Sequence, residues 1–308
     1  MQSLWMLFAS LGFALMGVCV KLASDLYSTS EIVLYRGLVG VVFILCLLWL
    51  RGGTLKTMLP GAHLWRGMVG VTSLWLWFYS FSQLPLATAV TLNYTSPIWI
   101  ALTLFVAAWW HGKKRIEWGL VGAIALSFVG VTMLLRPAIH AEQWLGGMLA
   151  LASGVLSALA YMQVRHLGQL GEPEYRVVFY FSVTGMVAGL AGSILHGGAA
   201  GVLWHPHSVR GIVLLLATGL FATSAQMAMT RAYRLGNVLV TANLQYTGIV
   251  FSSLLGILIW RDLLGWLSWA GIAVILTSGL IATYYNTRNA ARAVPTAVPE
   301  TDPIATEA

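Results

Sequence analysis

The stretch LNYTSP, residues 92–97, lies in the middle of the apolar run LATAVTLNYTSPIWIALTLFVAAWW, residues 86–110. The length and composition of this run are typical of a helix that crosses a lipid bilayer. Its centre nevertheless carries a carboxamide, a phenol, two hydroxyl groups and a proline. An altered copy, LQYTGI at residues 244–249, lies in a second apolar run. Polar side chains are costly in hydrocarbon unless they find partners, so both copies mark candidate functional segments.

The composition of the whole chain also indicates a membrane protein. Of its 308 residues, 58% are hydrophobic and 9% are charged, and its mean hydropathy is +0.80. Soluble domains carry about 25% charged residues, so this chain has too little polar surface to face water all round. We expect an all-α integral membrane protein. The net charge of +7 does not indicate a nucleic-acid partner, because the basic residues form no continuous stripe.

The apolar runs predict ten transmembrane helices joined by short loops, since a spanning helix needs about 20 mostly apolar residues. The predicted spans cover residues 3–23, 31–50, 64–84, 86–110, 116–135, 144–164, 174–196, 209–231, 237–260 and 266–286. Residues 287–308 are rich in Pro, Ala and Thr, and we expect them to form a disordered cytoplasmic tail.

Lysine and arginine residues predict the orientation of these spans, because the cytoplasmic loops of membrane proteins are enriched in both. With a cytoplasmic N-terminus, the cytoplasmic side holds Arg51, Lys56, Arg66, Lys113, Lys114, Arg115, Arg165, Arg176, Arg231, Arg234, Arg288 and Arg292. The opposite side holds Arg136, Arg210 and Arg261. We therefore expect a multi-pass protein of the inner (plasma) membrane with both termini in the cytoplasm.

An internal duplication explains why the polar motif occurs twice. When the sequence is shifted by 152 residues, Leu92–Thr95 (LNYT) meets Leu244–Thr247 (LQYT). Weaker matches elsewhere keep the same order along the chain. They predict one five-helix repeat over residues 3–137 and a second over residues 143–286. Because five is odd, the two repeats would cross the membrane in opposite directions and enclose a central cavity, as in many secondary transporters.

The motif also predicts where the two helices bend. Pro97 has no N–H group to donate to the carbonyl of Asn93, so the fourth span should kink there. In the second copy Gly248 and Ile249 replace the serine and the proline, and glycine should loosen that helix less. We expect an asymmetric pair of bends, with Pro97 and Gly248 as kink or gating positions.

Helical spacings of three and four residues place further polar side chains on shared faces of other spans. If these faces converge, they line a cavity whose candidate substrate-binding residues are Trp75, Tyr79, Asn93, Tyr94, Ser96, Tyr161, Gln226, Gln245 and Tyr246. Arg36, about a turn and a half into the second span, is a candidate contact for an anionic group. The alternative for each residue is structural, because hydroxyl groups bond to their own backbone and buried tyrosines also fill space.

Other sequence features argue against an enzyme. No Asp or Glu lies in the middle of a predicted span, so a carboxylate-based proton carrier has no obvious place. The sequence has no phosphate-binding loop and no nucleophile with a base near it. His205-Pro206-His207 offers two ligands in one short loop, which is a weak metal signal. We expect no catalytic residue, no metal site and no cofactor.

Five segments carry a family resemblance: YRGLVG at residues 35–40, LPLATAVTLNYTSPIWIAL at 84–102, WGLVGAIALSFVGVTMLL at 118–135, RLGNVLVTANLQYTGIVFSSLLGILIW at 234–260 and WAGIAVILTSGLIAT at 269–283. In this order they resemble the drug/metabolite transporter superfamily, in its ten-helix EamA-type branch. The resemblance implies two EamA units in inverted arrangement, which carry small organic metabolites through a cavity lined by helices one, three, four, six, eight and nine. Many relatives have an acidic residue after the fourth span, where this chain has HGKKR at residues 111–115.

Sequence and resemblance together predict a secondary transporter that moves a small amphipathic organic metabolite across the inner membrane by alternating access. The resemblance implies amino acids, S-adenosylmethionine-like compounds, vitamins or metallophore-type compounds as solutes. Two alternatives stay open: a lipid-flipping or assembly subunit that moves no soluble solute, and a membrane-embedded enzyme that acts on lipid. The expected partners are the small-molecule substrate and the lipid bilayer, and the chain is expected to act as a monomer or homodimer.

Overall fold

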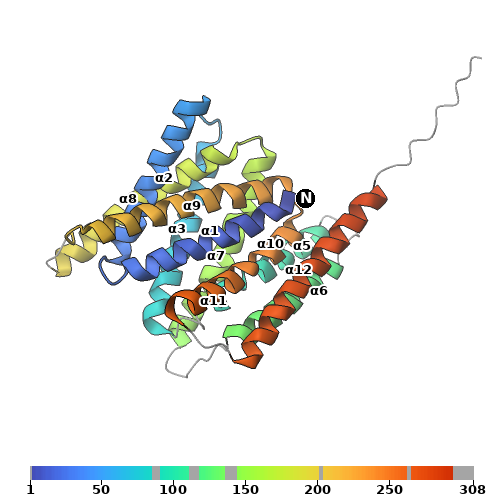
Figure 1. Ribbon diagram of the computed structural model, residues 1–308. Helices are drawn as coiled ribbons and strands as arrows, with labels where there is room; N and C mark the ends of the chain where they lie inside the picture. Colours follow the sequence, from blue (N-terminus) through green and yellow to red (C-terminus); the bar gives the residue numbers. More distant parts are fainter. Residues whose placement is uncertain are drawn as a thin grey trace, which may run out of the picture.

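The computed structural model describes residues 2–84, 91–110, 118–135, 144–200, 204–261 and 265–293. Within these ranges the ordered elements are all helices, and Figure 1 shows most of them as long rods packed side by side. They are a 3-10 turn, Gln2–Leu4, followed by α1 Trp5–Ala23, α2 Thr29–Arg51, α3 Pro60–Gln83, α5 Ser96–Trp110, α6 Trp118–Leu135, α7 Trp144–Gln169, α8 Glu174–Ala200, α9 Val209–Leu235, α10 Val238–Gln245, α11 Thr247–Trp260 and α12 Trp266–Ala293.

These helices overlap the predicted apolar runs, and their ends differ in places. α12 continues to Ala293, so its last turns lie in the segment that was expected to be disordered. The predicted HGKKR loop at residues 111–115, Arg136 and the tail residues 294–308 lie outside the described residues.

Seven helices in the described part of the chain are long and apolar enough to cross a membrane. Two further apolar helices, Thr91–Ala107 and Trp118–Leu134, are shorter. α3 is not among the seven, so the count of ten spans stays a prediction.

The outer surface of the helices carries large apolar side chains. Trp49, Trp110, Val209 and Leu258 are each more than three-quarters exposed. Soluble proteins rarely leave such side chains uncovered over a wide area. Together with the helix lengths, this surface indicates a helical membrane protein whose outer face meets lipid.

Four helix pairs run along one another: α1 with α9, α2 with α8, α3 with α7, and α6 with α12. The α6–α12 pair is seen at the lower right of Figure 1. These two helices approach closely at Gly130 and Gly271: a Cβ atom on Gly130 would lie 2.8 Å from the carbonyl oxygen of Gly271. Small residues at such a crossing let two backbones pack tightly, as is common between membrane helices.

Both copies of the polar motif interrupt their helices, which corrects the expected asymmetry. In the first copy a short helical turn ends at Asn93, and α5 begins at Ser96. In the second copy α10 ends at Gln245 and α11 begins at Thr247. The break therefore occurs at the same point of the motif, although only the first copy contains a proline.

The two copies also share a threonine that bonds to the backbone at the same place. The Thr95 hydroxyl donates to the Leu92 carbonyl at 2.6 Å, and the Thr247 hydroxyl donates to the Leu244 carbonyl at 2.7 Å. A hydroxyl that binds the carbonyl three residues earlier offers the backbone an alternative to the regular helical bond. Pro97 adds to the first break, but the LxYT pattern is what the two breaks have in common.

Candidate substrate-binding site

The two interrupted segments meet inside the protein. Gln245, the last residue of α10, donates its Nε2 to the Ser96 hydroxyl at the start of α5, over 3.4 Å. The Tyr233 hydroxyl of α9 donates to the Oε1 of Gln245 at 3.2 Å. All three side chains are buried. The carboxamide of the second motif thus connects its own helix to α9 and to the first motif.

The carboxamide of the first motif is held by α7. The Nδ2 of Asn93 donates to the Ser153 hydroxyl at 2.9 Å, and that hydroxyl donates to the Ala150 carbonyl at 2.6 Å. On the same side, the Ser73 hydroxyl of α3 lies 2.8 Å from the Ser157 hydroxyl and donates to the Ser153 carbonyl at 2.8 Å. Side chains of α3, α7 and the fourth segment therefore converge, although Ser73 was not on the face predicted for α3.

Four tyrosines surround these carboxamides. The rings of Tyr94 and Tyr246 lie 6.4 Å apart, centroid to centroid, and those of Tyr161 and Tyr233 stack at 5.5 Å. The Tyr161 hydroxyl lies beside the side chain of Gln245. The Tyr246 hydroxyl is buried and has no hydrogen-bond partner within the described residues.

Arg36 lies at a small pocket between α2, α8 and α9. Its neighbours in the pocket lining include Phe181, Ser182, Thr223 and Gln226. The guanidinium carbon of Arg36 lies 5.5 Å from the ring centroid of Phe181. The structure therefore brings two of the predicted site residues, Arg36 and Gln226, to one pocket.

Arg66 is a buried residue, although the sequence analysis placed it in a cytoplasmic loop. Its exposed fraction is 3%, and its guanidinium carbon lies 4.3 Å from the ring centroid of Phe181. Because α3 begins at Pro60, Arg66 falls in the second turn of the helix. The signal that could have found it is Pro60 itself, since proline favours the first position of a helix.

The remaining predicted residues are Trp75, Tyr79, Pro97 and Gly248, and a Cβ atom on Gly248 would lie 3.3 Å from the Tyr94 hydroxyl. Trp75 packs at the α3–α8 contact, where a Cβ atom on Gly192 would lie 2.6 Å from its ring. Tyr79 is 55% exposed. Pro97 is buried in the first turn of α5, and Gly248 lies in the first turn of α11, so both follow directly on the helix breaks.

One end of α2 is closed by a group of contacts that we call the Glu31 latch: Glu31, Tyr35, His205 and His207. Glu31 accepts hydrogen bonds from the backbone N–H of His205 at 2.9 Å and faces its Nδ1 at 2.7 Å. The Tyr35 hydroxyl lies 2.5 Å from the Nε2 of His207. The segment before α9 is thereby held against the start of α2. No cluster of three or more metal ligands occurs among the described residues.

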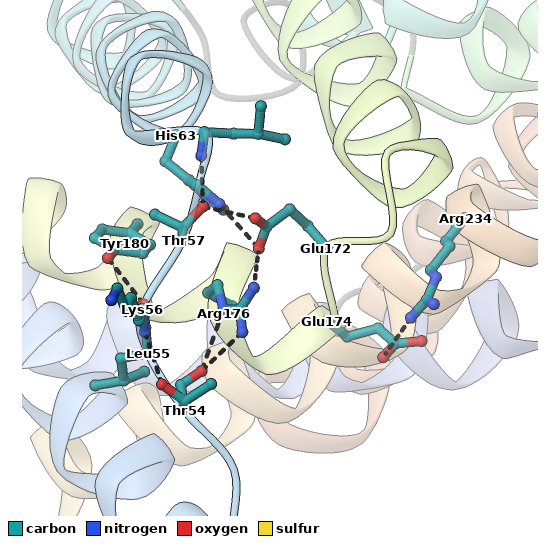
Figure 2. Close-up of polar contacts among 11 residues, drawn as sticks. Thr54, Leu55, Lys56, Thr57, His63, Glu172, Glu174, Arg176, Tyr180 and Arg234 are labelled. Carbon is teal, nitrogen blue, oxygen red and sulfur yellow. Dashed lines mark hydrogen bonds and ion pairs between the residues drawn. The ribbon is translucent and has the colours of Figure 1, made fainter.

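The opposite end of α2 carries a second group, the Glu172 latch: Thr57, His63, Glu172 and Arg176 (Figure 2). Glu172 accepts hydrogen bonds from the Thr57 hydroxyl at 2.6 Å and from Arg176 at 2.9 Å, and it lies 3.3 Å from the Nε2 of His63. Arg176 also donates to the Thr54 carbonyl just after α2. Burial raises the pKa of Glu172, but the bonds from Thr57 and Arg176 outweigh it and hold this pKa below its usual value.

A polar cluster that sequence reasoning missed lies between α10, α6 and α12. Asn243 is 1% exposed, and its Oδ1 accepts from the Ser127 hydroxyl at 2.9 Å and from the Ser278 hydroxyl at 3.4 Å. Its Nδ2 has no partner within the described residues. Asn243 stands two residues before Gln245, so it faces the other side of the helix from the predicted site.

Residues 1–136 match the EamA-like transporter family. This match ends at residue 136, directly after α6 ends at Leu135, so the matched residues include the helices from α1 to α6.

Relatives of known name extend over nearly the whole chain. The chain is 28% identical to the pseudopaline exporter of Pseudomonas aeruginosa over 276 residues, which are 88% of this chain and 91% of the exporter. It is 24% identical to the riboflavin transporter of Vibrio cholerae over 304 residues, 94% of this chain and 95% of that protein. It is 23% identical to the S-adenosylmethionine uptake transporter of Rickettsia bellii over 234 residues, 75% of each chain.

A solved structure has the same fold as this chain. A crystal structure with 17% sequence identity superposes with a TM-score of 0.76, and the match covers 94% of this chain and 98% of the other.

Proposed function

We propose that this chain is a secondary transporter, in which residues 3–137 and 143–286 form two inverted five-helix repeats that work by alternating access. The cargo is a small amphipathic organic metabolite. The observation that carries this proposal is the meeting of two interrupted polar segments in an otherwise apolar helical protein. In membranes, interrupted helices are tolerated where protein or a cavity satisfies the freed backbone groups, and in transporters they build the substrate site. The names of the relatives support transport rather than catalysis.

The helix packing supports the repeat. Suppose that each helix of the first half is exchanged for its counterpart in the second half: α1 for α7, α2 for α8, α3 for α9 and α6 for α12. The α1–α9 contact then becomes the α7–α3 contact, and the α2–α8 and α6–α12 contacts map onto themselves. The contact of α11 with α1 likewise becomes that of α5 with α7. These contacts are those that a two-fold axis between the halves requires, whereas the α7–α9 contact has no counterpart of similar extent between α1 and α3.

We propose the polar centre as the substrate site. Asn93, Gln245 and the tyrosines Tyr94, Tyr161 and Tyr246 would bind the solute, with Arg36 and Gln226 in the adjoining pocket. The carboxamides now bind serine hydroxyls, and these bonds can be exchanged for bonds to a solute. Ser96, Trp75 and Tyr79 stay proposed contacts on the sequence pattern.

The two latches have the properties of gates. The Glu31 latch joins the start of the second predicted span to the segment before the eighth. The Glu172 latch joins the start of the seventh predicted span to the segment before the third. The latches therefore lie at equivalent places in the two halves. Because α2 is 23 residues long, they are separated by roughly 35 Å. Alternating access needs one end to open while the other stays closed, and the release of one latch at a time would provide this. By the distribution of Lys and Arg, the Glu172 latch would lie at the cytoplasmic end.

The transport function is tested by comparing the metabolites of cells with and without the protein, followed by uptake of the changed compound into vesicles. We expect Asn93→Leu and Gln245→Leu to abolish uptake and still to insert into the membrane, because leucine inserts at least as well as an amide. Gln169→Leu, an exposed site at the end of α7, is the matched control and should transport normally. Equal uptake by all three variants would place the site elsewhere. If the purified protein moves no soluble solute, the lipid-flipping or assembly role replaces this proposal.

A further inference from the structure

Two arginines from different helices flank one aromatic ring in the interior. Arg36 comes from α2, Arg66 from α3 and Phe181 from α8, and the two guanidinium carbons lie 5.5 Å and 4.3 Å from the ring centroid. Arg36 lines one pocket together with Gln226, which is a proposed site residue. The pair is therefore adjacent to the proposed substrate site.

The two arginines have hydrogen-bonding groups without partners. The Nε of Arg36 and the Nε and Nη1 of Arg66 are buried and find no acceptor within the described residues. The ion pairs seen among the described residues are made by other basic side chains, and they hold the carboxylates of Glu31, Glu172 and Glu174 near the ends of the helices. Two positive charges thus lie near one ring, and no ion pair with a carboxylate is seen for either within the described residues.

Burying two arginines side by side destabilises the folded protein, so packing alone does not account for the pair. An arginine stays charged at any ordinary pH, and a buried charge without a partner is strongly unfavourable. A cation near an aromatic face is stabilised by about 2 kcal/mol when the pair is shielded from water. This contact does not reduce the repulsion between the two like charges. The guanidinium group of Arg66 lies against Gly70, four residues later in α3, where a Cβ atom would collide with it.

Building on the transport function above, we propose that the solute is an organic anion with at least two carboxylate groups. One carboxylate binds Arg36 and the other binds Arg66. The planar fork of a guanidinium group matches a carboxylate through two parallel hydrogen bonds, and the bound anion supplies the counter-charge that the protein lacks. Phe181 lies near both guanidinium groups. Ser182, Thr223 and Gln226 offer polar contacts to the remainder of the solute at the Arg36 side.

The test measures binding to the purified protein in detergent, so it does not depend on transport. The probes are glutarate and citrate, with glutaramide as the uncharged match of glutarate and inorganic phosphate as a second anion. We expect both carboxylates to raise the melting temperature and glutaramide to leave it unchanged. Stabilisation by glutaramide, by phosphate alone, or by none of the four would overturn the inference.

Variants of Arg66 separate a ligand contact from a structural role. Arg66→Met should raise the Kd of citrate about 30-fold or more, the change that corresponds to losing one buried charged hydrogen-bond partner. Without added citrate, Arg66→Met should melt at the same temperature as the parent or at a higher one, because it no longer buries an unpaired charge. Arg210→Met, at an exposed arginine near the start of α9, should alter neither quantity. A clear loss of stability in Arg66→Met with unchanged citrate binding would assign Arg66 to the structure and contradict the inference.

The two proposals fail in different ways. If citrate binds as expected but vesicles take up no solute, the anion site stands and the transport function falls. If vesicles take up an uncharged compound and Arg66→Met transports it normally, transport stands and the anionic solute falls.

Discussion

Replacing Thr247 by valine tests why both motif helices are interrupted. The change removes the hydroxyl that donates to the Leu244 carbonyl at 2.7 Å and keeps the branched shape of the side chain. The Ser10 hydroxyl also donates to this carbonyl, but over 3.5 Å, so it is a weak replacement. A buried hydrogen bond contributes about 1 kcal/mol net, and side-chain bonds in membrane proteins range from about 0.6 to 1.7 kcal/mol. We therefore expect Thr247→Val to lower the free energy of unfolding by about 1 kcal/mol.

The matched control is Thr277→Val in α12. Thr277 donates to the Ala273 carbonyl at the same distance, 2.7 Å, but on an exposed face of a continuous helix. Its loss should stay within about 0.5 kcal/mol, as for ordinary surface changes. Both variants are measured by equilibrium unfolding in mixed micelles. Equal changes in Thr247→Val and Thr277→Val would refute the special role of the motif threonine.

Three further predictions follow from individual contacts. Gly271→Ala should destabilise the protein by about 1–3 kcal/mol, because its Cβ would lie 2.5 Å from the carbonyl oxygen of Gly130. Gly122→Ala has open space around its Cβ and should not destabilise the protein, and thermal unfolding of both variants measures the difference. The Glu172 latch should hold above the usual pKa of a glutamate, about 4.3, and weaken as the pH falls through its lowered pKa, which hydrogen exchange of residues 52–59 can follow. Glu172→Gln should raise that exchange already at pH 7, and unchanged exchange would contradict the latch.

The helices were predictable from the sequence because lipid leaves few alternatives for an apolar chain. Runs of about 20 apolar residues must bond their own backbone groups internally, so their positions follow from composition. The sequence also indicated that the carboxamides of Asn93 and Gln245 need polar neighbours, because an amide in an apolar run is costly without them. Ser153 of α7 lay on a predicted polar face, whereas Tyr233 of α9 did not.

Other features depended on contacts that no single stretch of sequence reveals. Arg66 was taken for a loop residue because hydropathy sets helix ends only to within a few residues, and the true start at Pro60 buries it. The interruption of the second motif helix at Tyr246 was not expected, because that copy has no proline. The latches join residues more than a hundred positions apart, such as Thr57 and Glu172, and the sequence contains no local sign of them.

The central claim is that the two ends of the protein open in turn. It is tested most directly by measuring spin-label distances at both ends of α2 in one set of vesicles. Lys56 and Gln169 are exposed positions at the end with the Glu172 latch, and Asp25 and Pro206 are exposed positions at the other end. Each pair is labelled in a cysteine-free background and measured with and without a latch-breaking change.

With Glu172→Gln, the account predicts that the distance from residue 56 to residue 169 lengthens while the distance from residue 25 to residue 206 stays short. With Glu31→Gln, it predicts the reverse. Distances that lengthen together, or that do not respond to either change, would contradict alternating access between two opposed halves.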